Sequence, residues 1–109
     1  MYVSVTGLQL RSIMQRPRFA WHAMRAFAQA SKAPGNLFTD ARMLGGVHHT
    51  LTVWNDRQSM LAYLRKGAHR EAMKAYPALG MGRTCGYRAE CMPDWSEALE
   101  VWRRDATAA

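Results

Sequence analysis

The stretch from His48 to Met73, HHTLTVWNDRQSMLAYLRKGAHREAM, decides the fold. Its first residues alternate in polarity up to Trp54, which predicts a strand. Asn55 follows, and Gln58 stands three residues later in a capping-box pattern, so we expect Asn55 to cap a helix. Gly67 interrupts this helix, and a second helical piece follows from about residue 68 to residue 76. The stretch carries three of the four histidines of the chain. A strand that runs directly into a helix places His48 or His49 near the start of the element that carries His69.

The remaining elements are found by working outward from this stretch. Pro17 suits the first turn of a helix, and Gly45-Gly46 suits a hairpin turn. The predicted elements are a strand at Tyr2–Leu10, a helix from Pro17 to Lys32, strands at Leu37–Leu44 and Val47–Trp54, the interrupted helix that Pro77 and Gly80 end, a strand at Arg83–Met92 and a last helix capped by Asp94 with Glu97. This β-α-β-β-α-β order with an added C-terminal helix is the ferredoxin-like α+β pattern. It predicts an antiparallel four-stranded sheet with the helices on one face.

Length and composition indicate one globular domain. The chain has 109 residues, of which 49% are hydrophobic and 21% are charged, values typical of such a domain. We expect a single domain at 1–105 and a frayed tail at 106–109. The net charge of +7 comes from scattered basic residues. No nucleic-acid motif accompanies them, so no nucleic-acid partner is predicted.

The two cysteines and the apolar segments indicate a cytoplasmic protein. Cys85 and Cys91 would lie about 20 Å apart on one strand, too far for a disulfide, and their spacing does not match zinc ligands. We interpret them as small buried hydrophobes in a reducing compartment, and no metal site is predicted. No apolar stretch is long enough to span a bilayer, so no membrane partner is predicted either.

Alternation divides the strand residues into two faces. The apolar set comprises Val3, Val5, Val47, His49, Leu51, Val53, Cys85, Tyr87, Ala89 and Cys91. We expect this set to lie under the chain's own helices. The mixed set comprises Tyr2, Ser4, Thr6, His48, Thr50, Thr52, Trp54, Thr84, Gly86, Arg88 and Glu90. It is too bulky for a solvent face and too polar for a core, so we expect it to pack on a second copy in a homodimer.

The three clustered histidines receive different interpretations. His49 falls on the apolar face, where it is either a core histidine bonded to a backbone carbonyl or a polar group in a ligand pocket. His69 lies near a helix start, where the helix dipole lowers its pKa and favours the neutral ring. A neutral imidazole there is a base or a metal ligand, or it is a surface or capping residue. His48, on the mixed face, is expected at the subunit interface.

A family resemblance rests on the second half of the opening stretch. It is carried by Val53-Trp54, the turn Asn55-Asp56, the helix SMLAYL at 59–64 and the segment GAHREAM at 67–73. These residues resemble the dimeric α+β barrel superfamily, which includes the antibiotic-biosynthesis-type monooxygenases. The GxHRxAM pattern is similar to an uncharacterised branch of that superfamily. The resemblance implies a homodimer in which two sheets form a closed barrel, with a pocket between each sheet and its helices.

Haem chemistry of the type found in some of these proteins is not indicated. Haem-degrading members carry a helical Trp and, ten residues on, a His that ligates the iron. Counted from Trp54, those positions hold Tyr63 and Met73 in this chain. No CxxCH haem-attachment motif is present. We therefore predict no cofactor, with haem held by His69 or His49 as the alternative.

The resemblance implies a small monooxygenase that acts on a hydrophobic or aromatic molecule. We expect its pocket between the apolar sheet face and the helix at 56–76, with His69 as base or hydrogen-bond donor and His49 orienting the substrate. The residues expected to bind the substrate or shape its cavity are Tyr63, Trp54, Leu51, Tyr87 and Met73. The alternative is a non-catalytic barrel that binds a small ligand or haem, with some of the eight methionines lining an adaptable pocket.

Overall fold

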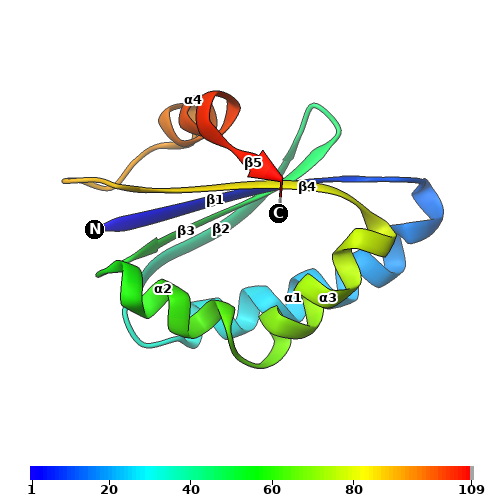
Figure 1. Ribbon diagram of the computed structural model, residues 1–109, viewed down its shortest axis with the longest axis horizontal. Coiled ribbons are helices and arrows are strands. Elements are labelled where there is room, and N and C mark those ends of the chain that lie inside the picture. Colours follow the sequence, from blue (N-terminus) through cyan, green and yellow to red (C-terminus); the bar gives the residue numbers. More distant parts are fainter. Residues whose placement is uncertain (109) are drawn as a thin grey trace.

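A single antiparallel sheet organises the chain (Figure 1). The computed structural model describes residues 1–108. Its elements are β1 (Tyr2–Leu10), a short 3₁₀ helix η1 (Ile13–Gln15), α1 (Arg16–Lys32), β2 (Asn36–Leu44), β3 (Val47–Trp54), α2 (Arg57–Leu64), α3 (Gly67–Leu79), β4 (Gly80–Arg88), α4 (Trp95–Asp105) and β5 (Thr107–Ala108). The strand order is β2-β3-β1-β4-β5. The predicted ferredoxin-like α+β fold is confirmed, with the two-residue β5 as an additional strand.

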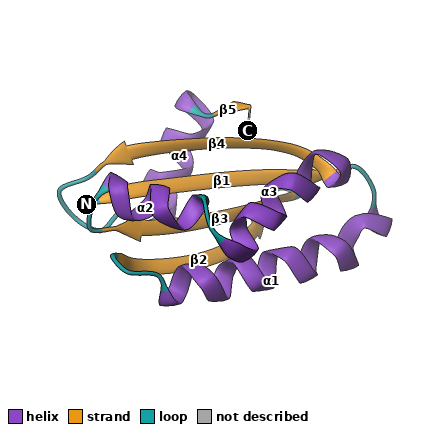
Figure 2. Ribbon diagram, turned by 60° about the horizontal axis from the view of Figure 1, so that its bottom comes forward, coloured by secondary structure: helices purple, strands orange, loops and turns teal. Residues whose placement is uncertain are grey.

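The helices occupy both faces of the sheet. In Figure 1, α1, α2 and α3 lie on one side, and α4 lies on the other side above β1 and β4. The prediction that all helices share one face is therefore wrong for α4. Figure 2 shows α1 running along the edge of the helical layer beside β2, with α3 next to it.

The apolar and mixed sets of strand residues each face the layer that was expected for the other set. The apolar set packs against α4, where Val3, Val5, Leu51 and Val53 form a buried cluster with Trp102. The mixed set faces the three helices α1 to α3 instead, as contacts of His48 with Phe19 and of Trp54 with Tyr63 demonstrate. The expected assignment was wrong because it gave every helix to the more apolar face. One amphipathic helix, α4, is enough to cover the centre of that face.

Several element boundaries also differ from the sequence prediction. Asp56, and not Asn55, caps α2, because its side chain accepts a hydrogen bond from the Ser59 N–H at 2.7 Å. Helix α3 continues through Pro77 to Leu79, since a proline in the last turn removes only one helical hydrogen bond. Strand β4 consequently begins at Gly80, directly after α3, and ends at Arg88.

The structure tests the predictions made for the two cysteines and for membrane-spanning segments. Cys85 is half-buried, whereas Cys91 is exposed, and both are free thiols, so the expectation that both are buried is wrong for Cys91. No helix within residues 1–108 combines the length and apolar character needed to cross a membrane.

Candidate functional site

A large cavity lies between the sheet and the layer of α1, α2 and α3. Its volume is about 1070 Å³. We call it the helix-side cavity. Side chains from all three helices form its walls, among them Phe19, Phe27, Met60, Tyr63, Leu64, His69, Met73 and Tyr76. These walls are largely aromatic and aliphatic, as is usual in sites that bind hydrophobic small molecules.

The floor of the cavity consists of small hydroxyl side chains, and these explain why the space remains unfilled. The hydroxyl floor comprises Ser4, Thr6, Thr50, Thr52 and Thr84. In the strand register Ser4 faces Thr52, and Thr6 faces both Thr50 and Thr84. The Thr84 hydroxyl lies 3.4 Å from the Val5 carbonyl oxygen. Within residues 1–108 the other four hydroxyls have no protein hydrogen bond, which leaves them free to bind a ligand.

His69 is placed in this cavity by the turn between α2 and α3. Its ring packs on Tyr63 with the centroids 4.6 Å apart, and its Nδ1 lies 3.4 Å from the Leu64 carbonyl oxygen. Burial lowers the pKa of His69, so the ring is neutral near pH 7. In the neutral ring Nδ1 carries the proton that faces the carbonyl oxygen, which leaves Nε2 with a free lone pair. A neutral imidazole with a free Nε2 is suited to accept a proton.

His48 lines the same cavity, although its place on the mixed face predicts a subunit interface. Its ring lies against Phe19 of α1, with the centroids 4.5 Å apart. Burial, together with the nearby positive charge of Arg16, lowers the pKa of His48. The expectation that His48 belongs to a subunit interface is wrong in geometry, because its face of the sheet is the one that α1 to α3 cover. The cavity therefore contains two neutral imidazoles, His48 and His69.

His49 also borders the cavity, as does His69, but its ring is turned toward α4. The ring is edge-on to Trp102 with the centroids 4.6 Å apart, and its Nδ1 lies 3.1 Å from the Thr6 carbonyl oxygen. Of the two interpretations left open for His49, this arrangement matches the core histidine bonded to a backbone carbonyl. His49 and His69 therefore line one cavity, while the His49 ring packs in the core under α4.

The remaining predicted site residues divide between the two faces. Tyr63 and Met73 line the helix-side cavity. Trp54 is fully buried behind Tyr63 and stacks on it with the centroids 5.1 Å apart. Leu51 belongs to the core under α4, and Tyr87 packs against that core. These last two predictions relied on the same reversed assignment of the sheet faces.

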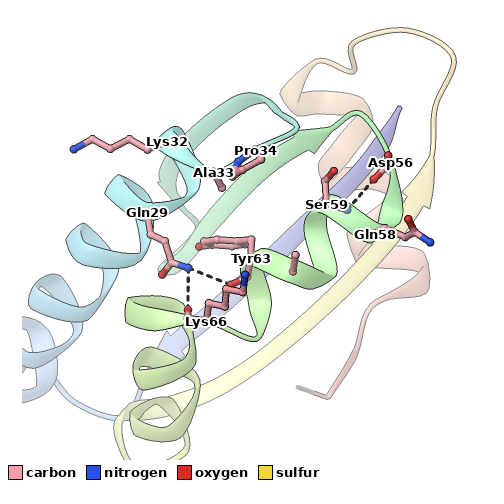
Figure 3. Close-up of a pocket in the computed structure, with 10 residues that line it drawn as sticks. Gln29, Lys32, Ala33, Pro34, Asp56, Gln58, Ser59, Tyr63 and Lys66 are labelled. Carbon is pink, nitrogen blue, oxygen red and sulfur yellow. Dashed lines mark hydrogen bonds between the residues drawn. The ribbon is translucent and has the colours of Figure 1, made fainter.

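Gln29 of α1 fixes the start of α3, the helix that carries His69. No sequence pattern points to this glutamine. As Figure 3 shows, its side chain reaches the turn between α2 and α3 beside a smaller pocket of about 560 Å³. Its Nε2 donates to the Lys66 carbonyl at 2.8 Å and to the Tyr63 carbonyl at 3.2 Å. Its Oε1 accepts from the His69 N–H at 2.8 Å. The neighbouring Gly67 has a φ of +55° and leaves room for this amide, so glycine is required there.

Replacing Gln29 with leucine is expected to lower the free energy of unfolding by about 1–3 kcal/mol, because the His69 N–H loses its side-chain acceptor and the Tyr63 and Lys66 carbonyls each lose one of their donors. Urea unfolding followed by circular dichroism measures this. The control is Gln58→Leu on the exposed surface of α2, which should change stability by less than about 0.5 kcal/mol. Equal stability of the two variants would contradict the role given to Gln29.

The lowered pKa values of His48, His49 and His69 predict a pH dependence of stability. Desolvation is the largest cause for each. The unfolded chain binds protons below about pH 6.5, whereas the folded chain resists protonation to lower pH. Stability should therefore be complete above about pH 6.5 and decline as the pH falls through that value toward the lower folded-state pKa. Urea midpoints at about pH 7.5 and about pH 5.5 test this, and a higher midpoint at the acidic pH would contradict it.

Within residues 1–108, no three side chains of His, Cys, Asp or Glu gather as a set able to hold a metal ion. The cavity combines two neutral imidazoles, a floor of hydroxyl groups and apolar walls.

Comparison with solved structures identifies the fold. A protein of Deinococcus radiodurans that is assigned as an antibiotic biosynthesis monooxygenase aligns with a TM-score of 0.75 and 14% identity, over 86% of this chain and 97% of that chain. A protein assigned the same activity in Nitrosomonas europaea aligns with a TM-score of 0.74 and 12% identity, over 84% of this chain and 100% of that chain. SnoaB, a cofactor-independent oxygenase of Streptomyces nogalater, aligns with a TM-score of 0.66 and 16% identity, over 85% of this chain and 97% of that chain.

Sequence comparison adds nothing to these matches. No protein-family model matches the chain, and no curated protein matches it. The similarity to the antibiotic-biosynthesis-type monooxygenases is therefore one of three-dimensional fold, as the Val53–Met73 stretch indicated.

Proposed function

Since the same fold serves a cofactor-independent oxygenase in Streptomyces nogalater, we propose that this chain is a small monooxygenase. Its substrate is a hydrophobic aromatic molecule bound in the helix-side cavity. The observation that carries the proposal is the half-buried His69 ring, which lines an apolar-walled cavity of about 1070 Å³ and whose pKa is lowered by burial. Fold alone does not determine chemistry, which depends on the groups at this site.

The proposed reaction needs a substrate that forms a stabilised carbanion, such as an anthrone or a quinol. His69 Nε2 removes a proton from the substrate, and the resulting carbanion transfers electrons to O₂. For the CH₂ group of an anthrone, one O₂ is consumed, the carbon becomes a carbonyl and the second oxygen atom leaves as water. A quinol likewise consumes one O₂, gains one oxygen atom on a ring carbon to become a hydroxyquinone, and releases the second oxygen atom as water. The apolar walls formed by Phe19, Phe27 and Leu64 exclude bulk water from the carbanion.

The hydroxyl floor and His48 line the wall of the cavity that the sheet forms. In this reaction the hydroxyls stabilise the anion that forms when the proton is removed. Proton removal places negative charge on the oxygen atoms of a phenol or anthrone. The hydroxyls of Ser4, Thr6, Thr50 and Thr52 are available to donate to those oxygens, because no protein group within residues 1–108 occupies them. Preorganised donors aimed at developing charge are among the largest contributions to catalysis.

Oxygen uptake tests the proposal. The protein is mixed with anthrone and quinol substrates in air-saturated buffer containing a chelator, and oxygen is followed with an electrode. We expect consumption that is linear in protein concentration, with the quinone as product by mass spectrometry. Tight binding of these compounds without oxygen consumption would favour the non-catalytic ligand-binding alternative and contradict the proposed reaction.

A homodimer is part of this proposal, formed through the sheet face that carries α4. The edge strand β2 exposes Phe38 and Leu44, each 38% exposed, and in the register both residues point to that face, opposite Val53 and Val47. Exposed apolar residues beside a core are typical of subunit contacts.

Light scattering is expected to give twice the chain mass of 12.4 kDa. Phe38→Glu should shift the protein to the monomer, because it places a charge in the contact. The matched control is Met43→Glu, on the same strand and exposed but opposite His48 and so on the other face of the sheet, which should remain dimeric. A monomeric unmodified protein would contradict the proposed dimer.

A further inference from the structure

The outer surface of α1 is apolar where a surface helix is normally polar. Ile13, Met14, Trp21 and Met24 are 66%, 80%, 55% and 72% exposed, respectively. At 3.6 residues per turn, Trp21 and Met24 lie on the side of α1 opposite to the buried Ala26. We call Trp21 and Met24, together with Met14 of the preceding η1, the α1 outer stripe. Figure 2 shows that α1 runs along the edge of the helical layer, and the side chains of the stripe are exposed.

Positive charge surrounds this stripe. Arg18, Arg25 and Lys32 are exposed on the same side of α1. The Arg25 guanidinium lies over the Trp21 ring, 4.5 Å from its centroid. No acidic residue occurs in the chain before Asp40. The stripe is therefore an apolar surface flanked by basic side chains of its own helix.

We propose that the α1 outer stripe docks on an anionic phospholipid surface. Helix α1 would lie flat on the membrane, with Trp21 and the methionines at the level of the acyl chains and the arginines at the headgroups. Arginine and tryptophan suit this depth, because each combines an apolar body with a polar end. The earlier prediction of no membrane partner considered spanning segments alone, and surface docking needs none.

The charge pattern favours lipid over a second copy of the chain. Two α1 helices in contact would bring Arg18 and Arg25 against like charges, which opposes a symmetric pair. A lipid headgroup supplies the missing negative charge, and acyl chains accommodate flexible methionine side chains without a shaped pocket.

The position of α1 relates the docking surface to the helix-side cavity. The inner side of the same helix contributes Phe19, Ala23 and Phe27 to the cavity wall. A hydrophobic ligand concentrates in the membrane, so a protein docked through α1 holds its cavity wall next to the ligand's reservoir. This link to a ligand rests on the proposed function, whereas docking itself does not.

Vesicle sedimentation tests the docking. The full chain is mixed with sucrose-loaded vesicles of phosphatidylcholine alone or of phosphatidylcholine with phosphatidylglycerol in equal parts. We expect the protein to pellet with the anionic vesicles and to remain in solution with the neutral ones, and to be released by high salt. Failure to pellet with the anionic vesicles would overturn the proposal, whatever the result of the oxygen assay.

Two substitutions identify the surface. Trp21→Glu should weaken the partition coefficient at least about tenfold, whereas Met92→Glu, which adds the same charge at an exposed site outside α1, should change it less than about twofold. Near-UV circular dichroism verifies that both variants are folded. Equal loss in both variants would indicate net charge alone and overturn the assignment to α1.

Sedimentation velocity without lipid tests whether a second copy of the chain, and not lipid, covers the α1 outer stripe. Self-association that Trp21→Glu abolishes would identify a second copy as the occupant and overturn the lipid proposal. Pelleting that is equal on neutral and anionic vesicles would overturn the electrostatic part of it. Binding to an acidic protein partner with no binding to vesicles would also overturn it.

Discussion

His69→Asn is expected to lower the turnover number for oxygen consumption by about 10²- to 10⁴-fold, the usual contribution of a general base. Asparagine retains an N–H donor for the Leu64 carbonyl, which Nδ1 of His69 faces at 3.4 Å, but it has no basic lone pair. The backbone N–H of residue 69 still donates to Gln29. We therefore expect the variant to fold normally, to bind substrate and to lose the chemical step. Oxygen-electrode assays at saturating substrate measure this.

The matched control is His49→Asn, on the α4 side of the sheet. His49 packs on Trp102 and faces the Thr6 carbonyl, so its replacement should affect stability and leave turnover within about threefold of the original. If His69→Asn keeps full turnover and His48→Asn loses it, the base is His48 instead. Loss in His49→Asn alone, with normal stability, would contradict the assignment of the site to the helix-side cavity.

Trp54→Ala is expected to lower the free energy of unfolding by about 3–5 kcal/mol, as large aromatic deletions in a core do. Trp54 is fully buried and stacks on Tyr63. The Tyr63 hydroxyl in turn donates to the Ala26 carbonyl of α1 at 3.0 Å. Loss of the indole leaves an internal void and removes the support behind Tyr63. Urea unfolding measures the loss, and a change below about 1 kcal/mol would contradict this role.

Trp54→Phe distinguishes packing from hydrogen bonding. The Trp54 Nε1 is buried and has no hydrogen-bond partner within residues 1–108. Phenylalanine removes that unpartnered donor and retains much of the stacking on Tyr63. We therefore expect Trp54→Phe to be clearly more stable than Trp54→Ala. Equal losses in the two variants would contradict packing of the ring on Tyr63 as the source of the stability.

The sequence was sufficient to predict the elements but not the layer that each sheet face contacts. The bounds of β1 and β3 follow from alternation alone, because one residue of slip would exchange their faces. Alternation also separates His48 from His49 correctly. It does not indicate which face a given helix covers, and α4 is the element that reverses the assignment. His48 was therefore assigned to the wrong environment although its face was right.

Two other parts of the site leave no local signal. Gln29 meets its partners across 34 to 40 positions of the chain, and no spacing rule joins an α1 glutamine to the turn before α3. The cavity itself arises from what Ser4, Thr6 and Thr52 lack, namely bulk, and an interior space is a property of the packed layers. By contrast, the neutral state of His69 was predicted from its position near a helix start, although burial, and not the helix dipole, is its main cause.

The hydroxyl floor has a consequence for selectivity. Neighbouring strands are spaced about 4.8 Å apart, so hydroxyls on β3, β1 and β4 recur at that interval across the sheet. In the empty cavity water must satisfy them, and a purely aliphatic guest would displace that water without replacing its hydrogen bonds. The strand spacing therefore sets the spacing of the hydrogen-bonding groups that a ligand meets. Ligands whose oxygen atoms have a matching spacing replace the water at little free-energy cost, and equally hydrophobic ligands without such oxygen atoms bind more weakly.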